Sequence, residues 1–212
     1  MTVRIHETAL IDDDVEIGDG SVVWDNAHIR SGARIGAGCI VGDKCYIGPD
    51  VVVGDLVKLN TGVYLCTGVS VARGVMISAH VVFTNDRYPR ATTPELSELL
   101  PSEADDSTLS TRVHEGATIG AAAVVGPGLE IGRFAMVGMG SVVTRSVRPF
   151  TLVVGNPAKP TALVCRCGHP IVKDMVNPPT SPGVECANCH RRYLVEGHHV
   201  AEMSSPDGPE NG

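Results

Sequence analysis

The chain contains the stretch Ala27-His28-Ile29-Arg30-Ser31-Gly32-Ala33-Arg34-Ile35-Gly36-Ala37-Gly38-Cys39-Ile40-Val41, in which an apolar residue returns at every sixth position. The same spacing begins at Ile5, continues to Phe83, and resumes from Val113 to Val143. A second position of each hexad holds small or β-branched residues, and a third holds mostly glycine, asparagine or aspartate. The last three types accept a positive φ. Each hexad therefore predicts a short strand followed by a corner.

Hexad repeats of this kind form a parallel β-helix with three hexads in each coil, which is an all-β fold. Residues 18 apart then stack, so that His28, Tyr46 and Tyr64 share one outward column. An exposed apolar column favours contact with a neighbouring subunit, and the alternative is that it only covers the coil edges. The low aromatic content of 4% and the 24 glycines fit a narrow, regular interior.

The repeat predicts how the chain divides. We expect a β-helix domain over residues 1–160, a small module over 161–196 and a disordered tail over 197–212. The hexads stop at an inserted loop, residues 84–112, which holds three prolines and an acidic run. A loop of this length in a compact domain is usually functional, and the alternative is a disordered surface insertion.

Composition excludes several classes of protein. The net charge of -7 argues against nucleic-acid binding, which normally needs a basic face. The sequence holds neither a run of 18 apolar residues nor a signal-peptide pattern at its N-terminus. We therefore expect no membrane insertion and a cytoplasmic location.

Four of the seven cysteines form two close pairs near the C-terminus, Cys165-Arg-Cys167 and Cys186-Ala-Asn-Cys189. Two thiol pairs about twenty residues apart are typical of a zinc ribbon, in which four thiolates surround a structural Zn²⁺. The spacing of the first pair is one residue shorter than usual. His169 or His190 replacing a thiolate, or a redox-active pair, are the alternatives.

Three segments carry a resemblance to a known family: Trp24-Asp25-Asn26-Ala27-His28-Ile29-Arg30, Val82-Phe83-Thr84-Asn85-Asp86-Arg87-Tyr88-Pro89-Arg90, and Leu152-Val153-Val154-Gly155-Asn156-Pro157-Ala158-Lys159. They resemble the left-handed β-helix N-acyltransferases that act on nucleotide-linked 3-amino sugars. The resemblance covers about residues 3–163, and the cysteine module departs from it. It implies a left-handed coil, acetyl-CoA as co-substrate, a UDP- or dTDP-linked amino sugar as acceptor, and a homotrimer with its sites between subunits. The product would serve surface polysaccharide or glycoside biosynthesis.

The resemblance also implies roles for particular residues. Asn85 falls on the family's asparagine that contacts the sugar amine, and direct attack of that amine on the thioester is expected. His80 is the candidate general base on other grounds, namely its corner position beside the loop and the suitable pKa of imidazole. The alternative is a corner histidine that is simply exposed. His28, Arg87 and Arg90 are candidates for substrate binding, the arginines through a diphosphate or carboxylate. For the two loop arginines, the alternative is pairing with the acidic run.

The coenzyme A site is expected beside the second block of repeats. Small residues there would leave backbone N–H and C=O groups open to the amides of the pantetheine arm, and the candidates are Gly120, Ala122, Gly138 and Gly140. Packing at corners is the alternative explanation for all four. Arg145 and Lys159 lie near the end of the repeats and are candidates to meet the phosphates.

The hexad pattern is also compatible with other functions. An O-acetyltransferase acting on a sugar or serine-like hydroxyl would show the same hexads. A non-catalytic trimeric scaffold that binds sugar nucleotides would too. A carbonic anhydrase of this fold would need three histidines around an open zinc site, and the histidines here occupy different hexad positions.

Overall fold

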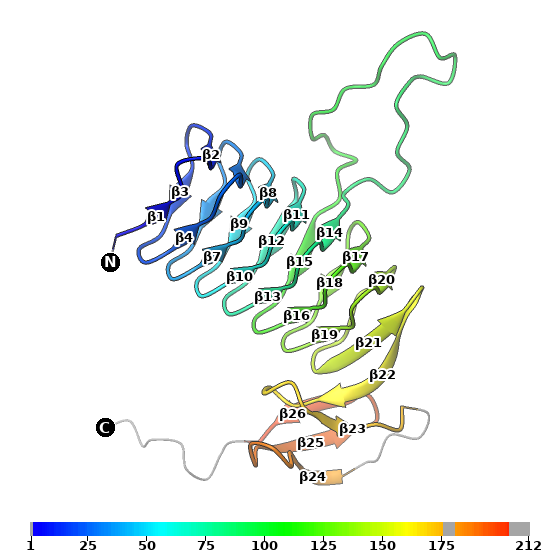
Figure 1. Cartoon of the computed structure of the whole chain (residues 1–212). Helices are drawn as coiled ribbons and strands as arrows, with labels where there is room; N and C mark the ends of the chain where they lie inside the picture. The colour runs from blue at the N-terminus through cyan, green and yellow to red at the C-terminus, as the bar shows by residue number, and fades with distance from the viewer. Residues whose placement is uncertain (1, 176–180, 204–212) are drawn as a thin grey trace.

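The computed structural model describes residues 2–175 and 181–203, and its main body is a parallel β-solenoid with three faces (Figure 1). The described residues form strands, turns and loops and no helix. None of the described residues forms a helix long and apolar enough to cross a membrane. The parallel β-helix predicted from the hexads is confirmed.

Each coil contributes one short strand to each face, and the coils stack in parallel. The first sheet contains β1 (Arg4–Ile5), β4 (Val22–Val23), β7 (Ile40–Val41), β10 (Lys58–Leu59), β13 (Met76–Ile77), β16 (Thr118–Ile119), β19 (Met136–Val137) and β21 (Thr151–Gly155). The second contains β2 (Leu10–Ile11), β5 (His28–Ile29), β8 (Tyr46–Ile47), β11 (Tyr64–Leu65), β14 (Val82–Phe83), β17 (Val124–Val125) and β20 (Val142–Val143). The third contains β3 (Glu16–Ile17), β6 (Arg34–Ile35), β9 (Val52–Val53), β12 (Val69–Val71), β15 (Thr111–Val113) and β18 (Glu130–Ile131).

The strand register confirms three hexads per coil. Tyr46 aligns with His28 on one side and with Tyr64 on the other, and Val22 aligns with Ile40. The second residue of each two-residue strand points inward, as at Ile29 and Val41, which are fully buried. Each such aliphatic side chain contributes about 1.5–3 kcal/mol by leaving water. The alternation seen in the sequence is therefore the core of the solenoid.

Glycine is needed at some corners because of close packing between coils, and at others because of its conformational freedom. A Cβ on Gly42 would lie 2.7 Å from the backbone carbonyl carbon of Asn60 in the next coil. Coils stack at the strand spacing of about 4.8 Å, which leaves no room for a side chain directed along the stack. Gly74 differs, because its φ is +68° and a Cβ there would meet nothing within 4 Å.

The inserted loop leaves the solenoid between β14 and β15 and extends away from it (Figure 1). It therefore spans residues 84–110. A single bridge between Thr92 and Leu99 is its only strand-like pairing among the described residues. The loop re-enters the stack where the Leu109 N–H donates to the Asn85 carbonyl at 3.0 Å.

The C-terminal module begins as a continuation of the last coil. β21 turns back into β22 (Ala158–Val164), which pairs antiparallel with it, and β23 (Pro170–Val172) follows in the same sheet. A separate antiparallel sheet contains β24 (Ser181–Glu185), β25 (Arg192–Glu196) and β26 (His199–Glu202). The module covers the end of the stack and so occupies a sheet edge that would otherwise be open to pairing (Figure 1).

The predicted disordered tail at 197–212 is wrong in its first part. Gly197, with a φ of +58°, turns the chain so that His199–Glu202 forms β26 against β25. Gly197 and His198 therefore form a hairpin turn, and the described chain continues through β26. Residues 204–212 of the predicted tail lie outside the described residues.

Candidate functional site

Asn85 lies half-buried at the corner where the loop leaves the second sheet. Its Nδ2 donates to the Thr67 carbonyl of the preceding coil at 3.2 Å. A carbonyl oxygen can only accept, so this bond fixes which end of the amide is the nitrogen. The amide oxygen therefore faces the other way, and it accepts no hydrogen bond from the described residues. It can accept one from an incoming amine.

Cys66 is the reactive residue type nearest to this corner in sequence, directly before Thr67. Its side chain is buried, and burial raises the pKa of the Cys66 thiol to about 11. The thiol thus stays protonated near neutral pH and is a poor nucleophile.

His80 lies at the other end of β14, on the corner that joins the first and second sheets. It is exposed and has a φ of +58°, and its N–H donates to the Thr61 carbonyl at 2.9 Å. Its ring lies over Gly62, where a Cβ would be 2.5 Å from Nδ1. Within one chain, β14 separates His80 from Asn85, so the structure does not bring these two candidates together.

Arg87 and Arg90 are exposed on the loop. Arg90 donates from Nη1 to the carbonyl of its neighbour Pro89 at 2.9 Å. Neither arginine forms an ion pair with another described residue, so neither is neutralised by the loop's carboxylates. Both guanidinium groups can accept an anionic ligand.

His28 belongs to a polar and aromatic cluster on the second sheet. Its Nε2 lies 2.9 Å from Asp12 Oδ1, and Arg30 Nε lies 2.7 Å from Asp12 Oδ2. Hydrogen bonds from His28 and then from Arg30 lower the pKa of the Asp12 carboxyl. Arg30 also donates to the Tyr46 hydroxyl at 3.0 Å, and the Tyr46 ring stacks on Tyr64 with centroids 5.0 Å apart. The stacking of residues 18 apart predicts the column of His28, Tyr46 and Tyr64, but it does not predict the ion pairs with Asp12.

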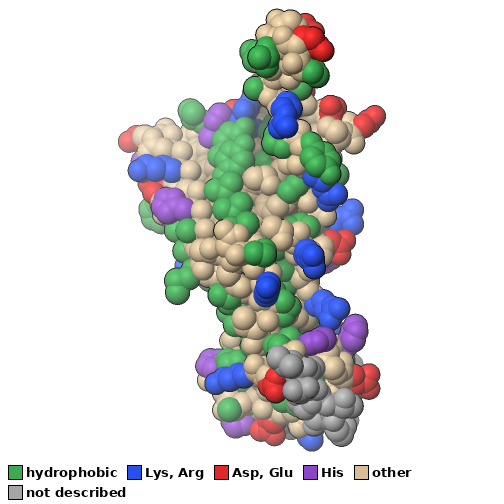
Figure 2. Space-filling model, turned by 90° about the vertical axis from the view of Figure 1, so that its right-hand side faces the viewer, with side chains coloured by type: hydrophobic (Ala, Val, Ile, Leu, Met, Phe, Trp, Pro, Cys, Tyr) green, Lys and Arg blue, Asp and Glu red, His purple; other side chains and the backbone are tan. Residues whose placement is uncertain are grey.

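Apolar side chains continue this column along the second sheet. Leu10, Tyr64 and Val82 are 60%, 41% and 37% exposed, although they lie on a regular face. Figure 2 shows a band of hydrophobic side chains along the solenoid. The contiguous band is the type of surface that a second subunit would cover.

The four small residues predicted at the coenzyme site have their N–H groups already occupied. Gly120 donates to Val137, Ala122 to Ala79, Gly138 to Val153 and Gly140 to Ala121, all at 2.8 or 2.9 Å. The expectation of open backbone groups is wrong for these N–H groups, because the stacked coils use them. The carbonyls of Ala122 and Gly140 accept no backbone hydrogen bond from the described residues and remain as acceptors.

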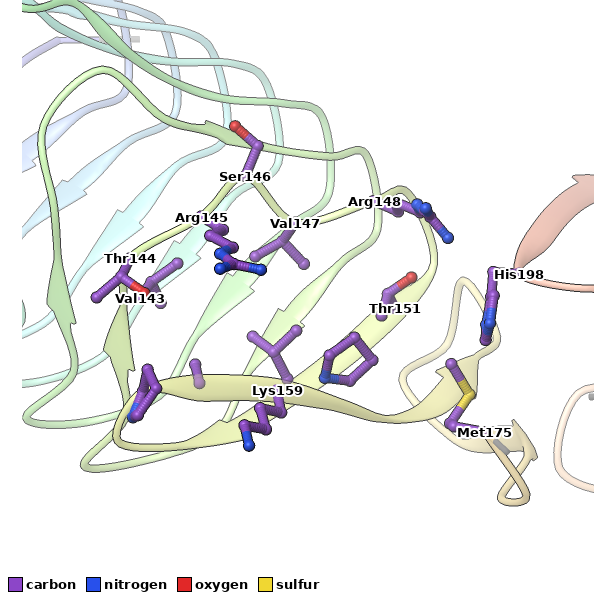
Figure 3. A pocket seen from close by; sticks show the side chains of 14 residues that line it. Val143, Thr144, Arg145, Ser146, Val147, Arg148, Thr151, Lys159, Met175 and His198 are labelled. Carbon is purple, nitrogen blue, oxygen red and sulfur yellow. The ribbon is translucent and has the colours of Figure 1, made fainter. Parts of the chain in front are cut away.

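Arg145 and Lys159 do come together. Both line a cavity of about 620 Å³ between the end of the last coil and β22 (Figure 3). Its lining also includes Arg148, Thr151, Met175 and His198, and none of the 14 lining residues is acidic. Within the described part of the chain, none of the three cations pairs with a carboxylate. The cavity is therefore suited to a phosphate-bearing ligand.

The four predicted metal ligands also converge. The thiol sulfurs of Cys165, Cys167, Cys186 and Cys189 all lie within 4.8 Å of one another. The Cys165–Cys189 and Cys167–Cys186 sulfurs are 3.3 Å and 3.7 Å apart. A tetrahedral ion with Zn–S bonds of about 2.3 Å places its sulfurs about 3.8 Å apart. The four thiols thus fit one tetrahedral soft-metal ion.

The two histidines of the module lie beside this cluster without completing it. His169 Nδ1 is 3.6 Å from Cys167 Sγ, and His190 Nδ1 instead meets Glu185 at 3.0 Å. Because four thiols already surround one point, neither imidazole is needed as a ligand. The open position that a catalytic zinc requires is also lacking among these groups.

The comparisons with known proteins agree with this fold. Residues 14–49 match the family model of the bacterial transferase hexapeptide with six repeats. An N-acyltransferase from Bacillus cereus, AntD, in a structure with dTDP and coenzyme A, superposes with a TM-score of 0.61. The alignment covers 71% of this chain and 85% of that one at 21% identity, which supports the fold alone. Residues 14–49 thus carry the hexapeptide repeat of bacterial transferases, and the chain as a whole has the parallel β-helix fold.

Two curated relatives match shorter parts of the chain. A dTDP-3-amino-3,6-dideoxy-alpha-D-galactopyranose 3-N-acetyltransferase from Aneurinibacillus thermoaerophilus is 51% identical over 57 residues, 27% of this chain and 30% of that enzyme. A chloramphenicol acetyltransferase from Klebsiella aerogenes is 51% identical over 41 residues, 19% and 20% of the two chains. The matched segments thus span less than a third of either relative's length.

Proposed function

We propose that this protein is an acetyl-CoA-dependent N-acetyltransferase that acylates the amino group of a UDP- or dTDP-linked amino sugar, at C3. The observation that carries the proposal is Asn85, whose amide oxygen is fixed outward by the bond to Thr67. The cationic cavity at Arg145 and Lys159 supports a phosphate-bearing acyl donor. The 3-N-acetyltransferase named above supports the acceptor and its position. Surface polysaccharide or glycoside biosynthesis would consume such a product.

The chemistry needs no covalent enzyme intermediate. The neutral amine attacks the thioester carbonyl, the new C–N bond forms, and the C–S bond breaks. The CoA thiolate leaves, and the proton that the amine nitrogen loses goes to a base within reach or, where there is none, to this thiolate. Asn85 Oδ1 accepts an amine N–H and so directs the lone pair toward the thioester, and alignment of this kind is worth about 7–11 kcal/mol. Protonated Cys66 offers no competing acyl acceptor.

The acceptor is assigned to groups around Asn85 and the second sheet. His28, Arg87 and Arg90 are proposed to bind the nucleotide sugar, the arginines through its diphosphate. His80 is proposed as the base only in a subunit interface, because β14 keeps it from Asn85 of its own chain. The carbonyls of Ala122 and Gly140 are proposed acceptors for pantetheine amides.

Two further expectations are proposed here as well. The apolar band on the second sheet supports a homotrimer with that face at the interface. The seven cysteines form no disulfide, and this supports a reducing, cytoplasmic location.

Asn85→Ala tests the assigned role. We expect kcat/KM for the amino sugar to fall about 100-fold, because misplacing the amine by about 1 Å costs that much. Ser70→Ala, on the outer side of the third sheet, is the matched control. An unchanged kcat/KM in the Asn85 variant, with the oligomer intact by light scattering, contradicts the role. Acetylation of a hydroxyl sugar in place of the amine, or nucleotide binding without any thiol release, would support the O-acetyltransferase or the scaffold instead.

We also propose that the four cysteines hold a structural Zn²⁺. The sulfur separations fit a tetrahedral ion, and four protein ligands leave no position for a substrate. Elemental analysis of the purified protein should give one zinc per chain. Cys186→Ser should lower that content to a small fraction, and full content in this variant would contradict the assignment.

A further inference from the structure

Two residues of the cysteine module form one wall of the cationic cavity. Met175 follows β23, and His198 lies in the turn between β25 and β26, and both line the cavity with Arg145, Arg148 and Lys159. Figure 3 shows Met175 and His198 at the end of the cavity away from Thr144 and Arg145. The solenoid alone would therefore leave this end of the cavity open.

A continuous set of contacts joins the cysteine cluster to the cavity. Cys165 Sγ lies 3.0 Å from the Tyr193 hydroxyl, which also accepts the Arg166 N–H at 3.0 Å. The fully buried Tyr193 ring meets Phe150 edge-on, with centroids 5.7 Å apart. Phe150 stacks in turn on Phe134 of the last coils at 5.4 Å.

The same short segments carry both the metal ligand and the cavity residues. Phe150 lies between Arg148 and Thr151 in sequence, and both of these line the cavity. β22 begins beside Lys159 and runs directly into Cys165. A displacement of Cys165 therefore moves the strand that carries Lys159.

The module has too small a core to hold this arrangement without a metal. Besides two of the cysteines, its buried cluster consists of Phe150, Leu163, Val172, Tyr193 and Val195, and the first of these belongs to the last coil. Units this small usually depend on a metal or disulfides, and the binding energy of a structural zinc is then folding energy. The module's cysteines form no disulfide. Metal loading should therefore decide whether Met175 and His198 stay in place.

We propose that the cysteine module, with its metal bound, is part of the acyl-donor site. By holding Met175 and His198 against the last coil, it completes the cavity that binds the phosphate groups of coenzyme A. This rests on the proposed function for the identity of the ligand. Arg145, Arg148 and Lys159 supply the positive charge, and the His198 ring N–H can donate to a phosphate oxygen. The metal acts on ligand affinity through the wall and does not touch the ligand.

Calorimetric titration of coenzyme A into the full-length protein tests the coupling. Zinc-loaded protein is compared with protein whose metal has been removed by a chelator, and circular dichroism and light scattering follow the solenoid and its oligomer. We expect the Kd for coenzyme A to rise at least tenfold without metal while both controls stay unchanged. An unchanged Kd overturns the coupling and leaves the proposed function standing. Absence of binding to the zinc-loaded protein overturns the proposed function, and with it the ligand assigned to this cavity.

Wall variants test the same idea with the metal still bound. His198→Ala and Met175→Ala should each raise the Kd threefold to tenfold at full zinc content. His199→Ala changes the next residue, which is exposed on β26 and does not line the cavity, and it should leave the Kd unchanged. Equal Kd values for the His198, Met175 and His199 variants and the unaltered protein would overturn the proposal.

Discussion

Arg145→Met should weaken coenzyme A binding by a factor that the structure allows us to estimate. The guanidinium is exposed, lines the cavity and has no carboxylate partner among the described residues. A phosphate 4 Å away gains about 1 kcal/mol in bulk water and about 4 kcal/mol near a protein surface. Hydrogen bonds to charged groups contribute about 1.5–3 kcal/mol. A loss of about 1.5–3 kcal/mol raises the Kd about 10- to 100-fold.

The assay is calorimetric titration of coenzyme A at low and at high salt. Methionine keeps most of the length of the side chain and removes its charge. The difference between variant and unaltered protein should shrink at 1 M salt, where the screening length is about 3 Å. Arg34→Met is the control, because Arg34 is equally charged but lies on the third sheet, 3.8 Å from Glu16. A Kd that Arg145→Met leaves within twofold of the original would refute the assignment of this cavity to the phosphates.

Three further predictions concern stability and metal binding. Gly42→Ala should lower the free energy of unfolding by about 1–3 kcal/mol, because its Cβ would lie 2.7 Å from the next coil. Gly74→Ala has open space around its Cβ and should cost only the positive-φ strain of about 1–2 kcal/mol. Equal losses of several kcal/mol for both variants in denaturant titrations would contradict this reasoning. The pKa of Asp12 is lowered in the folded state, so the stability that this carboxylate contributes is present above the ordinary pKa of 3.8 and is lost as pH falls through the lower folded pKa. Asp12→Asn should therefore make Tm fall less steeply below pH 3.8. Parallel curves of Tm against pH for the variant and the unaltered protein would disprove this. Tyr193→Phe removes the hydroxyl that lies 3.0 Å from Cys165 Sγ and should weaken zinc binding about tenfold in chelator competition. An unchanged zinc affinity would show that this hydroxyl does not support Cys165 as a metal ligand.

Periodicity made the fold predictable, because each inward residue has the same surroundings in every coil. Ile29, Val41 and their equivalents are buried because each occupies the inward position of its hexad, and this position recurs every six residues. The cysteine cluster was predictable as well, since thiol spacing reflects the geometry of a single ion. Asn85 was found by resemblance, and the structure adds the bond to Thr67 that orients its amide.

The remaining features depend on contacts that follow no period. Met175 and His198 reach the cavity from a module whose placement on the last coil the hexads do not specify. The amides of Gly120 and Gly138 looked available because small side chains expose the backbone, yet coil stacking uses those N–H groups. The hairpin at Gly197 was missed because a short polar segment predicts a turn and a tail equally well.

The central claim is transfer of an acetyl group from acetyl-CoA to a sugar amine, and product analysis tests it most directly. The zinc-loaded protein is incubated with acetyl-CoA and a dTDP- or UDP-linked 3-amino sugar, and in parallel with the matching 3-hydroxy sugar. Free thiol and product mass are followed together. We predict thiol release coupled to the mass gain of one acetyl group on the amino sugar alone. Acetylation of the hydroxy sugar, or no thiol release with any amino sugar despite its binding, would contradict the account.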